Sequence, residues 1–393
     1  MSSPIDRKAF EKLRRIAPNQ LAARREPHEW RARALPEELG FKLTNRCDLR
    51  CTTCYQWNED GYHHRLPGID KGRDLPLTVI AKVLEATRQL RSNVFLWGGE
   101  PLVYREWDGL VELLAAHERW TSICTNGTLI ERRMESLLRI SRHLEMSVSI
   151  DGFEAEHDAI RGSGSFGRTM AGLRSLVRWK NQGRYHGETT VNCVISDATI
   201  PRLHDFVRFL ESEAVETVFL SFPWYISGDT ATAMDAYVAA NLSHIGTSPL
   251  ASWRSFTFRL EPRWLGQLRT QLARIAETTW RIKLRYNPEL DPETELPEFL
   301  AGSSKPAQNK TRCLAVRTRM DVFPNGDVVT CKFFPEDNAQ IVGQQSDLLH
   351  ESVEATMNSP RASGDSFQHH LHLHADCDLD ADNNAHSIGG WNR

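Results

Sequence analysis

The sequence lacks the features of a membrane-spanning, secreted or nucleic-acid-binding protein. No apolar run approaches the roughly 18 residues that a membrane helix needs. The first residues, MSSPIDRKAFEKLRR, have no apolar core of a secretory signal. The net charge of −3 gives no sign of the basic surface of a general nucleic-acid binder. We therefore expect a cytoplasmic protein that binds neither membranes nor nucleic acids.

Cysteine is scarce but clustered. The chain has 8 cysteines in 393 residues, and in a reducing compartment thiols are more often metal ligands or buried residues than disulfides. Cys47, Cys51 and Cys54 form a C-x3-C-x2-C motif after a short apolar run. Cys124 and Cys193 stand alone in strand-like runs, where we expect small buried hydrophobic residues. The last three cysteines lie in the C-terminal quarter: Cys313, Cys331 and Cys377.

Apolar runs typical of strands alternate with helical patterns through the first part of the chain. The six runs are residues 40–43, 94–97, 121–125, 145–150, 189–195 and 218–222. This alternation predicts parallel βα units, in a barrel or a doubly wound sheet. Later, residues 317–334 alternate between polar and apolar on both sides of Pro324-Asn325-Gly326-Asp327. That pattern predicts a β-hairpin and a change of architecture.

These changes of pattern divide the chain into five expected parts. We expect a helical leader at 1–36, a barrel at 37–225, a helical and substrate-facing connector at 226–305, a small hairpin module at 306–382 and a tail at 383–393.

The spacing of the first three cysteines favours an iron–sulfur cluster over a zinc ion. A structural zinc ion has four protein ligands. The nearby candidates for a fourth ligand, His63 and His64, lie beyond a glycine-containing loop. An iron–sulfur cluster can leave one iron without a protein ligand, because inorganic sulfide holds that iron in place. Zinc and a purely structural role remain the alternatives.

Further motifs follow the cysteines, each at the end of an apolar run. Trp97-Gly98-Gly99-Glu100-Pro101 ends the second run, Thr125-Asn126-Gly127 the third and Ser149-Ile150-Asp151-Gly152 the fourth, and Arg161 follows in HDAIRGSGSF. The carboxyl ends of barrel strands are where such enzymes assemble their sites. In this combination and order, residues 38–222 resemble the radical S-adenosylmethionine (radical SAM) enzymes. Thr53 departs from the pattern, because many relatives have an aromatic residue there.

The resemblance implies a partial (β/α)6 barrel of the TIM type with a catalytic cofactor site. Cys47, Cys51 and Cys54 would hold a [4Fe–4S] cluster whose open iron chelates SAM. The cofactor-binding residues would be Gly98, Gly99, Glu100, Pro101, Thr125, Asn126, Ser149, Asp151 and Arg161.

The chemistry of these side chains suits SAM. Glu100 would bind the ammonium group of SAM, and Arg161 would bind its carboxylate. Gly98 and Gly99 would let the backbone approach the ligand. An electron from a donor such as flavodoxin or ferredoxin would then cleave SAM to a 5′-deoxyadenosyl radical, a step that belongs to the cofactor.

The C-terminal cysteines resemble the auxiliary-cluster modules called SPASM and twitch domains. A full SPASM module carries seven cysteines, so Cys313, Cys331 and Cys377 imply at most one further [4Fe–4S] cluster. Relatives usually close with C-x2-C, whereas this chain has Cys377 and Asp380. The fourth ligand is therefore missing, or supplied by Asp380, a nearby histidine or the substrate. A zinc ion and a module without a cluster stay open.

The resemblance implies a peptide or a small molecule as substrate. The first hypothesis is oxidative modification or crosslinking of a side chain in a ribosomal peptide, with aromatic residues around 222–225, Trp253 and Trp264 lining a groove. The leader at 1–36 is too short for a winged-helix recognition domain, so a separate peptide-recognition protein, or none, would be required. The alternatives are a radical dehydrogenase or epimerase of a small-molecule natural product and a non-catalytic iron–sulfur sensor.

Overall fold

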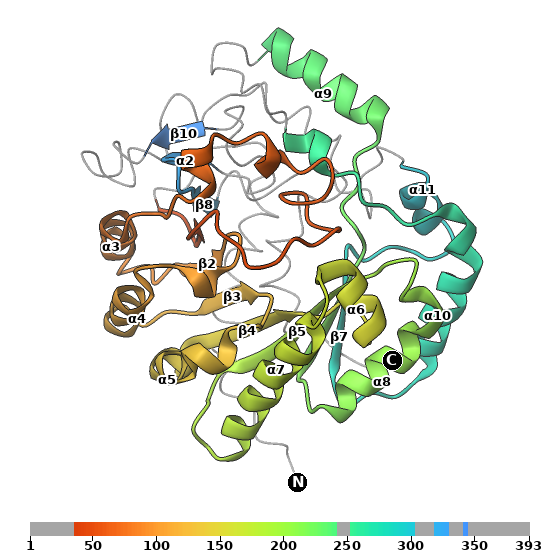
Figure 1. The fold of residues 1–393 in the computed structure, drawn as a ribbon, viewed down its shortest axis with the longest axis horizontal. Coiled ribbons are helices and arrows are strands. Elements are labelled where there is room, and N and C mark those ends of the chain that lie inside the picture. The colour runs from red at the N-terminus through yellow and green to blue at the C-terminus, as the bar shows by residue number, and fades with distance from the viewer. Residues whose placement is uncertain (1–34, 242–251, 303–317, 330–340, 345–393) are drawn as a thin grey trace, which may run out of the picture.

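The computed structural model describes residues 35–241, 252–302, 318–329 and 341–344 (Figure 1). They contain a ten-stranded sheet in the order β10-β9-β8-β1-β2-β3-β4-β5-β6-β7. The strands from β1 to β7 run parallel to their neighbours. Their bounds are β1 Glu38–Lys42, β2 Asn93–Trp97, β3 Thr121–Thr125, β4 Leu144–Ser149, β5 Glu188–Val194, β6 Thr217–Ser221 and β7 Lys283–Asn287. The predicted βα architecture is confirmed, and each of the six predicted strands lies within two residues of its predicted bounds.

Helices cover the outer face of the curved sheet, and the loop after β1 lies on its inner side (Figure 1). The longer helices are α3 Leu77–Ala86, α4 Trp107–Ala116, α5 Ile130–Ile140, α6 Glu154–Arg161, α7 Ser165–Asn181, α8 Leu203–Ser212, α9 Gly228–Asn241 and α10 Leu265–Glu277. Two short ones are α2 Gly68–Lys71 and α11 Glu295–Leu300. No helix of the described segments is long and apolar enough to cross a membrane.

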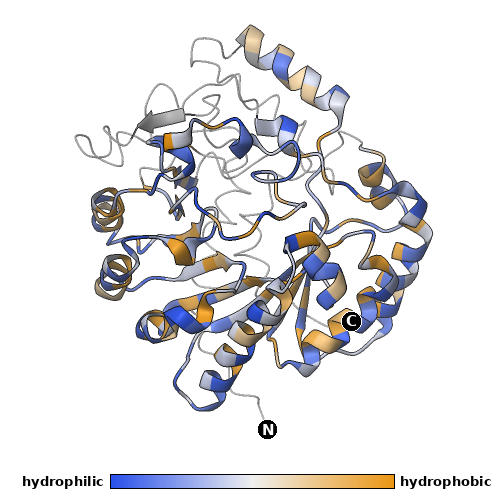
Figure 2. Ribbon diagram, viewed as in Figure 1, coloured by the Kyte–Doolittle hydropathy of each residue, from blue (hydrophilic) through white to orange (hydrophobic). Residues whose placement is uncertain are grey.

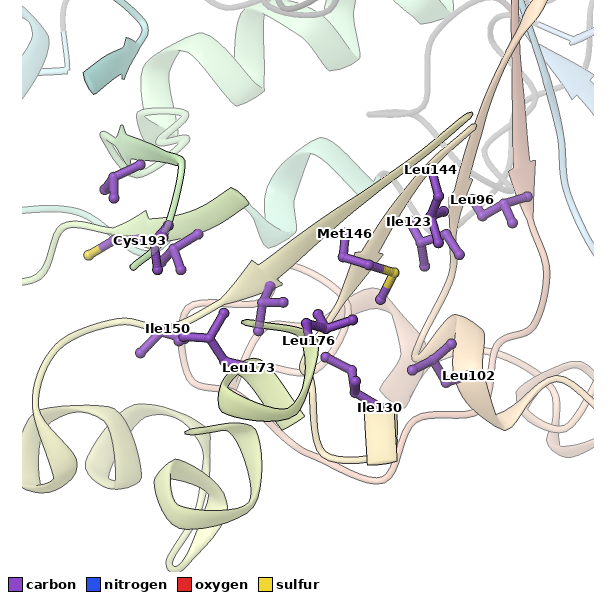
Figure 3. Close-up of a cluster of buried hydrophobic side chains, with 14 of the residues drawn as sticks. Leu96, Leu102, Ile123, Ile130, Leu144, Met146, Ile150, Leu173, Leu176 and Cys193 are labelled. Carbon is purple, nitrogen blue, oxygen red and sulfur yellow. The ribbon is translucent and has the colours of Figure 1, made fainter. Parts of the chain in front are cut away.

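The apolar stripes of the outer helices meet the outward side chains of the strands. In α8 the buried apolar residues recur at helical spacing, at Leu203, Phe206, Val207 and Leu210. Figure 2 shows apolar colour concentrated where helices meet the sheet. In Figure 3, strand residues such as Ile123 and Met146 face helix residues such as Leu173 and Leu176. Burial of this interface supplies the main stabilising free energy of the barrel.

One strand of the parallel sheet was not predicted. β7 lies in the segment that we expected to be a helical connector, and it pairs with β6 over Thr217–Ser221 and Lys283–Asn287. Its sequence, KLRYN, is polar at alternate positions, and only its last residue is buried. β7 forms the outer edge of the sheet, so it lacks the apolar run of a central parallel strand.

The predicted hairpin is confirmed, and it continues the sheet at the edge of β1. β8 (Arg319–Val322) pairs parallel with β1. β9 (Asp327–Val329) returns antiparallel to β8. β10 (Ile341–Gln344) in turn pairs antiparallel with β9. In the turn, the Phe323 N–H donates to the Asp327 carbonyl at 2.9 Å, and Gly326 adopts a positive φ of 102°.

A buried ion pair joins this hairpin to the barrel. The Arg319 guanidinium donates to both carboxylate oxygens of Asp321, at 2.6 and 3.1 Å, and to Glu38 on β1 at 3.2 Å. Asp321 lies opposite Gly40 in the parallel register, where a Cβ would come 1.6 Å from the Asp321 carboxylate. Gly40 therefore makes the space that the ion pair fills.

We expect Asp321→Ala to lower the free energy of unfolding by about 3 kcal/mol, because it leaves the Arg319 charge buried beside Gly40 without its main partner. Urea denaturation followed by circular dichroism measures the change. Glu112→Ala is the matched control, because it breaks an exposed pair with Arg139 and should leave the midpoint nearly unchanged. If both variants shifted the denaturation midpoint equally, the buried ion pair of Arg319 and Asp321 would not have the stabilising role given to it here.

Candidate active site

The three cysteines lie on the loop that follows β1, at the carboxyl end of the parallel strands. Main-chain hydrogen bonds fix this loop to the loop after β2: the Gly99 N–H donates to the Thr44 carbonyl and the Glu100 N–H to the Arg46 carbonyl, both at 2.8 Å. On the other side, the Thr52 N–H donates to the Ile160 carbonyl of α6 at 2.9 Å. The loop is thus held by the neighbouring strand and by a helix from the far side of the site.

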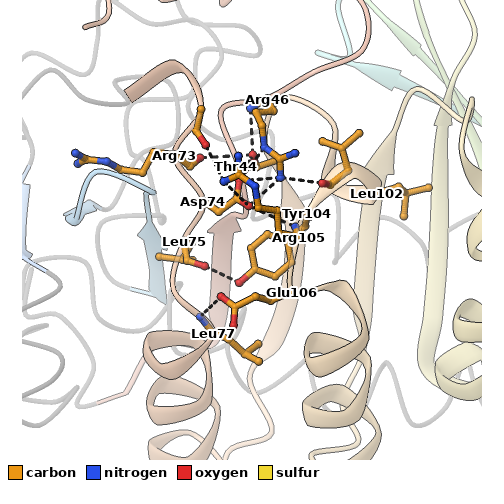
Figure 4. Close-up of polar contacts among 12 residues, drawn as sticks. Thr44, Arg46, Arg73, Asp74, Leu75, Leu77, Leu102, Tyr104, Arg105 and Glu106 are labelled. Carbon is orange, nitrogen blue, oxygen red and sulfur yellow. Dashed lines mark hydrogen bonds and ion pairs between the residues drawn. The ribbon is translucent and has the colours of Figure 1, made fainter. Parts of the chain in front are cut away.

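Polar side chains brace the start of the loop (Figure 4). Arg46 donates to the Asp74 carboxylate at 2.8 Å and to the Val103 carbonyl at 2.9 Å. Thr44 donates to the same carboxylate. Asp48, within the loop, accepts from Asn126 and Thr128 at 2.7 Å each. These contacts tie the cysteine loop to the ends of β2 and β3.

Gly98 and Gly99 are required by the packing of this loop. A Cβ at Gly99 would lie 2.2 Å from the Arg46 carbonyl oxygen, and one at Gly98 would lie 2.6 Å from that of Thr44. Both obstacles are backbone atoms, which no side-chain rotation can move away. We expected Gly98 and Gly99 to let the backbone approach a ligand. In the structure they instead let the backbone approach the cysteine loop.

The surroundings of the thiols suit an iron–sulfur cluster. The Leu49 N–H donates to the Cys47 sulfur at 3.4 Å, and Arg161 donates to that of Cys51 at 3.8 Å. The N–H groups of Gln56 and Trp57 donate to the sulfur of Cys54. Burial raises the pKa of all three thiols, that of Cys51 to about 12. A bound metal would therefore have to displace the thiol protons, and the N–H donors would then stabilise the thiolates.

The histidines that could have completed a zinc site are engaged elsewhere. The His63 ring nitrogen Nε2 lies 3.3 Å from the Lys42 ammonium, and that of His64 lies 2.9 Å from the Asn58 carbonyl. Within the described segments, no three Cys, His, Asp or Glu side chains converge closely enough to hold a single ion. Three thiols spread around a cavity suit a cluster better than one tetrahedral ion.

Glu100 is buried at the centre of a hydrogen-bond network. Its carboxylate accepts from the Leu102 N–H at 3.0 Å, the Thr125 hydroxyl at 2.7 Å and the Asn126 N–H at 2.8 Å. Burial raises the pKa of Glu100 to about 7, although these three donors oppose the shift. Three donors leave one of the carboxylate's acceptor positions for a ligand.

Arg161 and Asp151 form a buried ion pair beside the thiols. The Arg161 Nε–H donates to Asp151 at 2.7 Å, and the second oxygen of Asp151 accepts from the Val194 N–H at 2.9 Å. Burial opposes the charged form of Arg161, but Asp151 and Cys51 outweigh it and raise the pKa of the guanidinium. The Asp151 carboxylate thus has protein partners on both oxygens.

A cavity of about 260 Å³ brings most of the predicted residues together. Its lining includes Cys47, Cys51, Cys54, Gly99, Glu100, Thr125, Asn126, Ser149 and Arg161. Gly98, Pro101 and Asp151 are not among the residues that line it. Cys124, expected as a core residue, also lines the cavity, whereas Cys193 is fully buried in the core as expected. Cys313, Cys331, Cys377 and Asp380 lie outside the described residues.

Residues 41–206 match the family model of the radical SAM superfamily. The chain carries a radical SAM domain. Mycofactocin maturase MftC of Mycolicibacterium smegmatis is 26% identical over 170 residues, which are 43% of this chain and 40% of that protein. Pre-heme d1 synthase of Dinoroseobacter shibae is 28% identical over 184 residues, or 46% of this chain and 42% of that protein. The chain thus matches less than half the length of these curated relatives.

Solved structures share the fold beyond the radical SAM domain. Streptococcus suis SuiB bound to S-adenosylmethionine aligns with a TM-score of 0.56, 16% identity and coverage of 90% of this chain and 72% of that one. Native anSMEcpe with bound AdoMet aligns with a TM-score of 0.54, 17% identity and coverage of 83% and 82%. Identities this low establish the fold alone.

The structure adds cavity residues that the sequence analysis missed. Asn192, Ser221 and Asn287 lie at or near the carboxyl ends of β5, β6 and β7 and line the cavity opposite the cysteine loop. Asn192 and Ser221 interrupt apolar runs, a signal that the sequence contained. Asn287 could not be found that way, because β7 was not predicted. Of the expected aromatic groove, Phe222, Pro223 and Trp224 line the cavity. Trp253 does not line it but packs in one cluster with Phe256, and Trp264 packs against the main core.

The raised pKa of Glu100 predicts a pH dependence of stability. Between about pH 4.5 and pH 7 the folded chain holds a proton that the unfolded chain has released, so the free energy of unfolding falls as pH rises through this window. Glu100→Gln should remove this component. Urea denaturation at several pH values should therefore show wild type losing stability relative to the variant as pH rises. Parallel pH profiles would contradict the burial argument.

We expect Gly99→Ala to separate the cysteine loop from β2, because the added Cβ meets backbone atoms. The variant should lose most of its bound iron after anaerobic reconstitution and unfold at a lower temperature. Gly68→Ala is the control, because a Cβ there meets no atom within 4 Å. Iron analysis and calorimetry are carried out on both variants. The prediction is refuted if Gly99→Ala binds as much iron as the wild type.

Proposed function

We propose that the protein is a radical SAM enzyme that abstracts a hydrogen atom from its substrate, for oxidative modification or crosslinking of a ribosomal peptide side chain. The observation that carries this proposal is the convergence of three thiols, the Glu100 carboxylate and the Arg161 guanidinium on one buried cavity. Cys47, Cys51 and Cys54 would hold the cluster, and SAM would bind between Glu100 and Arg161. When bound, the cluster and SAM supply one-electron cleavage to a 5′-deoxyadenosyl radical.

The protein's own residues orient and shield this chemistry. Asp151 accepts from the Nε–H of Arg161 and the Cys51 sulfur accepts from Nη1, so the remaining N–H groups of the guanidinium would bind a carboxylate. Glu100 has a free acceptor position and a pKa of about 7, and an arriving ammonium would keep it ionised. Aromatic residues on the opposite wall, including Phe222 and Phe256, keep water from a reactive intermediate.

The relatives support both substrate classes. A mycofactocin maturase is among the sequence matches, and a SuiB structure with precursor peptide SuiA has the same fold. These favour a peptide substrate, with a separate peptide-recognition protein as a candidate partner. The match to pre-heme d1 synthase supports the second candidate, a radical dehydrogenase or epimerase of a small molecule.

We also propose an auxiliary [4Fe–4S] cluster at Cys313, Cys331 and Cys377, with Asp380 as a candidate fourth ligand. Its support is the hairpin beside the site: Phe323 packs edge-on against Trp97, the residue before Gly98, with ring centroids 5.6 Å apart. A second cluster there would accept the electron left after hydrogen abstraction. Flavodoxin or ferredoxin would supply the first electron.

The decisive experiment replaces Cys47, Cys51 and Cys54 together by alanine. We expect iron to fall from about eight to about four atoms per chain if two clusters are present. Release of 5′-deoxyadenosine from SAM after dithionite reduction should also be abolished. Anaerobic iron and sulfide analysis and chromatography of the nucleoside provide the readouts.

Cys193→Ala is the control, because this thiol lies in the apolar core, and it should keep its iron and its nucleoside release. A fall from about four iron atoms to none would remove the auxiliary cluster from the proposal. No deoxyadenosine from fully loaded wild type would refute radical chemistry and favour the sensor hypothesis.

A further inference from the structure

The cavity has a second half that the binding of SAM does not explain. Its wall is formed by Asn192, Ser221 and Asn287 at or near the ends of β5, β6 and β7, by the loop after Cys54, and by Ser255, Phe256 and Phe258. The Ser221 hydroxyl donates to the Asn192 side-chain oxygen at 2.7 Å. Asn287 is 7% exposed, yet its side-chain oxygen has no hydrogen-bond partner among the described residues.

A similar unpaired acceptor lies on the loop after the cysteines. Asn58 is 6% exposed, and its amide nitrogen donates to the Ser255 carbonyl at 3.0 Å. That bond fixes the orientation of the amide, so its oxygen is the atom left without a partner in the described structure. Buried acceptors without donors are costly. The Gln56 side-chain oxygen, also in the lining, lacks a partner as well, and three such acceptors around one cavity indicate a ligand that brings N–H or O–H groups.

The rest of this half is aromatic. Tyr55 stacks on Phe256 with ring centroids 4.5 Å apart and an angle of 11° between the planes. Phe222, Trp224 and Phe258 extend this surface along the cavity. Flat apolar walls with a few fixed polar atoms are typical of sites that select an apolar group and its orientation.

The charges of the lining narrow the choice of ligand. Arg161 is the one cationic side chain among the residues that line this cavity in the described structure, and it is paired with Asp151. A ligand with several carboxylates or phosphates would find no countercharge beyond Arg161, and its oxygen atoms could not donate to the unpaired amide oxygens of the lining. A neutral chain of amides would instead satisfy the unpaired oxygens with its N–H groups.

We propose that Asn58 and Asn287 are specificity residues that accept hydrogen bonds from substrate amide N–H groups, while the Tyr55–Phe256 wall holds an adjacent apolar side chain. The site therefore selects a peptide segment and rejects polyanionic small molecules such as tetrapyrrole carboxylates. This assignment rests on the proposed function, because it concerns the substrate of the same cavity.

The test compares two probes on the full chain, reconstituted with cluster and SAM. N-acetyl-L-phenylalaninamide has amide N–H groups; its fully N-methylated counterpart has none. Saturation-transfer NMR should show the first probe binding about tenfold more tightly, since the second leaves buried acceptors unpaired. In Asn287→Leu this preference should fall to less than about threefold, whereas Asn287→Asp, which retains acceptor oxygens, should keep it.

Asn181→Leu is the matched control, because Asn181 is an exposed residue at the end of α7, and it should preserve the wild-type preference. Equal binding of both probes by wild type, binding of neither, or an unchanged preference in Asn287→Leu would overturn the inference. So would displacement of the amide probe by coproporphyrin III, a tetracarboxylate. Release of 5′-deoxyadenosine by the same wild-type samples shows separately whether the proposed function holds.

Discussion

Two main-chain hydrogen bonds, from Gly99 to Thr44 and from Glu100 to Arg46, join the loop after β1 to the loop after β2. They form only because positions 98 and 99 have no Cβ. Through them, the thiols and the Glu100 carboxylate belong to one rigid piece of backbone. The geometry of the candidate cofactor site is thus set by the packing of two strand ends and not by the side chains alone.

Electrostatics divides the cavity into two halves with different chemistry. Near the cysteines lie an acid with a raised pKa and a guanidinium held by Asp151, which together match a zwitterion. The other half offers amide oxygens, a hydroxyl and aromatic rings but no charge of its own. A ligand that reacts by hydrogen abstraction would lie across the boundary, with its reacting bond at the charged half and its recognition groups at the neutral one.

Much of the fold could be predicted from sequence, because central parallel strands need apolar runs and amphipathic helices need a 3.6-residue repeat. β7 could not, because an edge strand keeps polar residues. That the three thiols and Glu100 lie around one cavity could be predicted from motifs at strand ends. The partner of Asp151 could not, because Arg161 is ten residues further along the chain and only the folding of α6 brings the two together. Asn58 was missed for the same reason, since its partner Ser255 is distant in sequence.

The hairpin of β8 and β9 has a consequence for how the chain can be divided. The change of sequence pattern near residue 306 does not coincide with an edge of the sheet, because β8 pairs directly with β1. Removing the C-terminal segment would leave the main-chain N–H and C=O groups on the β8 side of β1 without partners, on the strand that leads into the cysteine loop, while those paired with β2 would remain bonded. Evolutionary gain or loss of this segment would therefore have required a new way to cover β1, and the two parts of the chain are expected to have changed together.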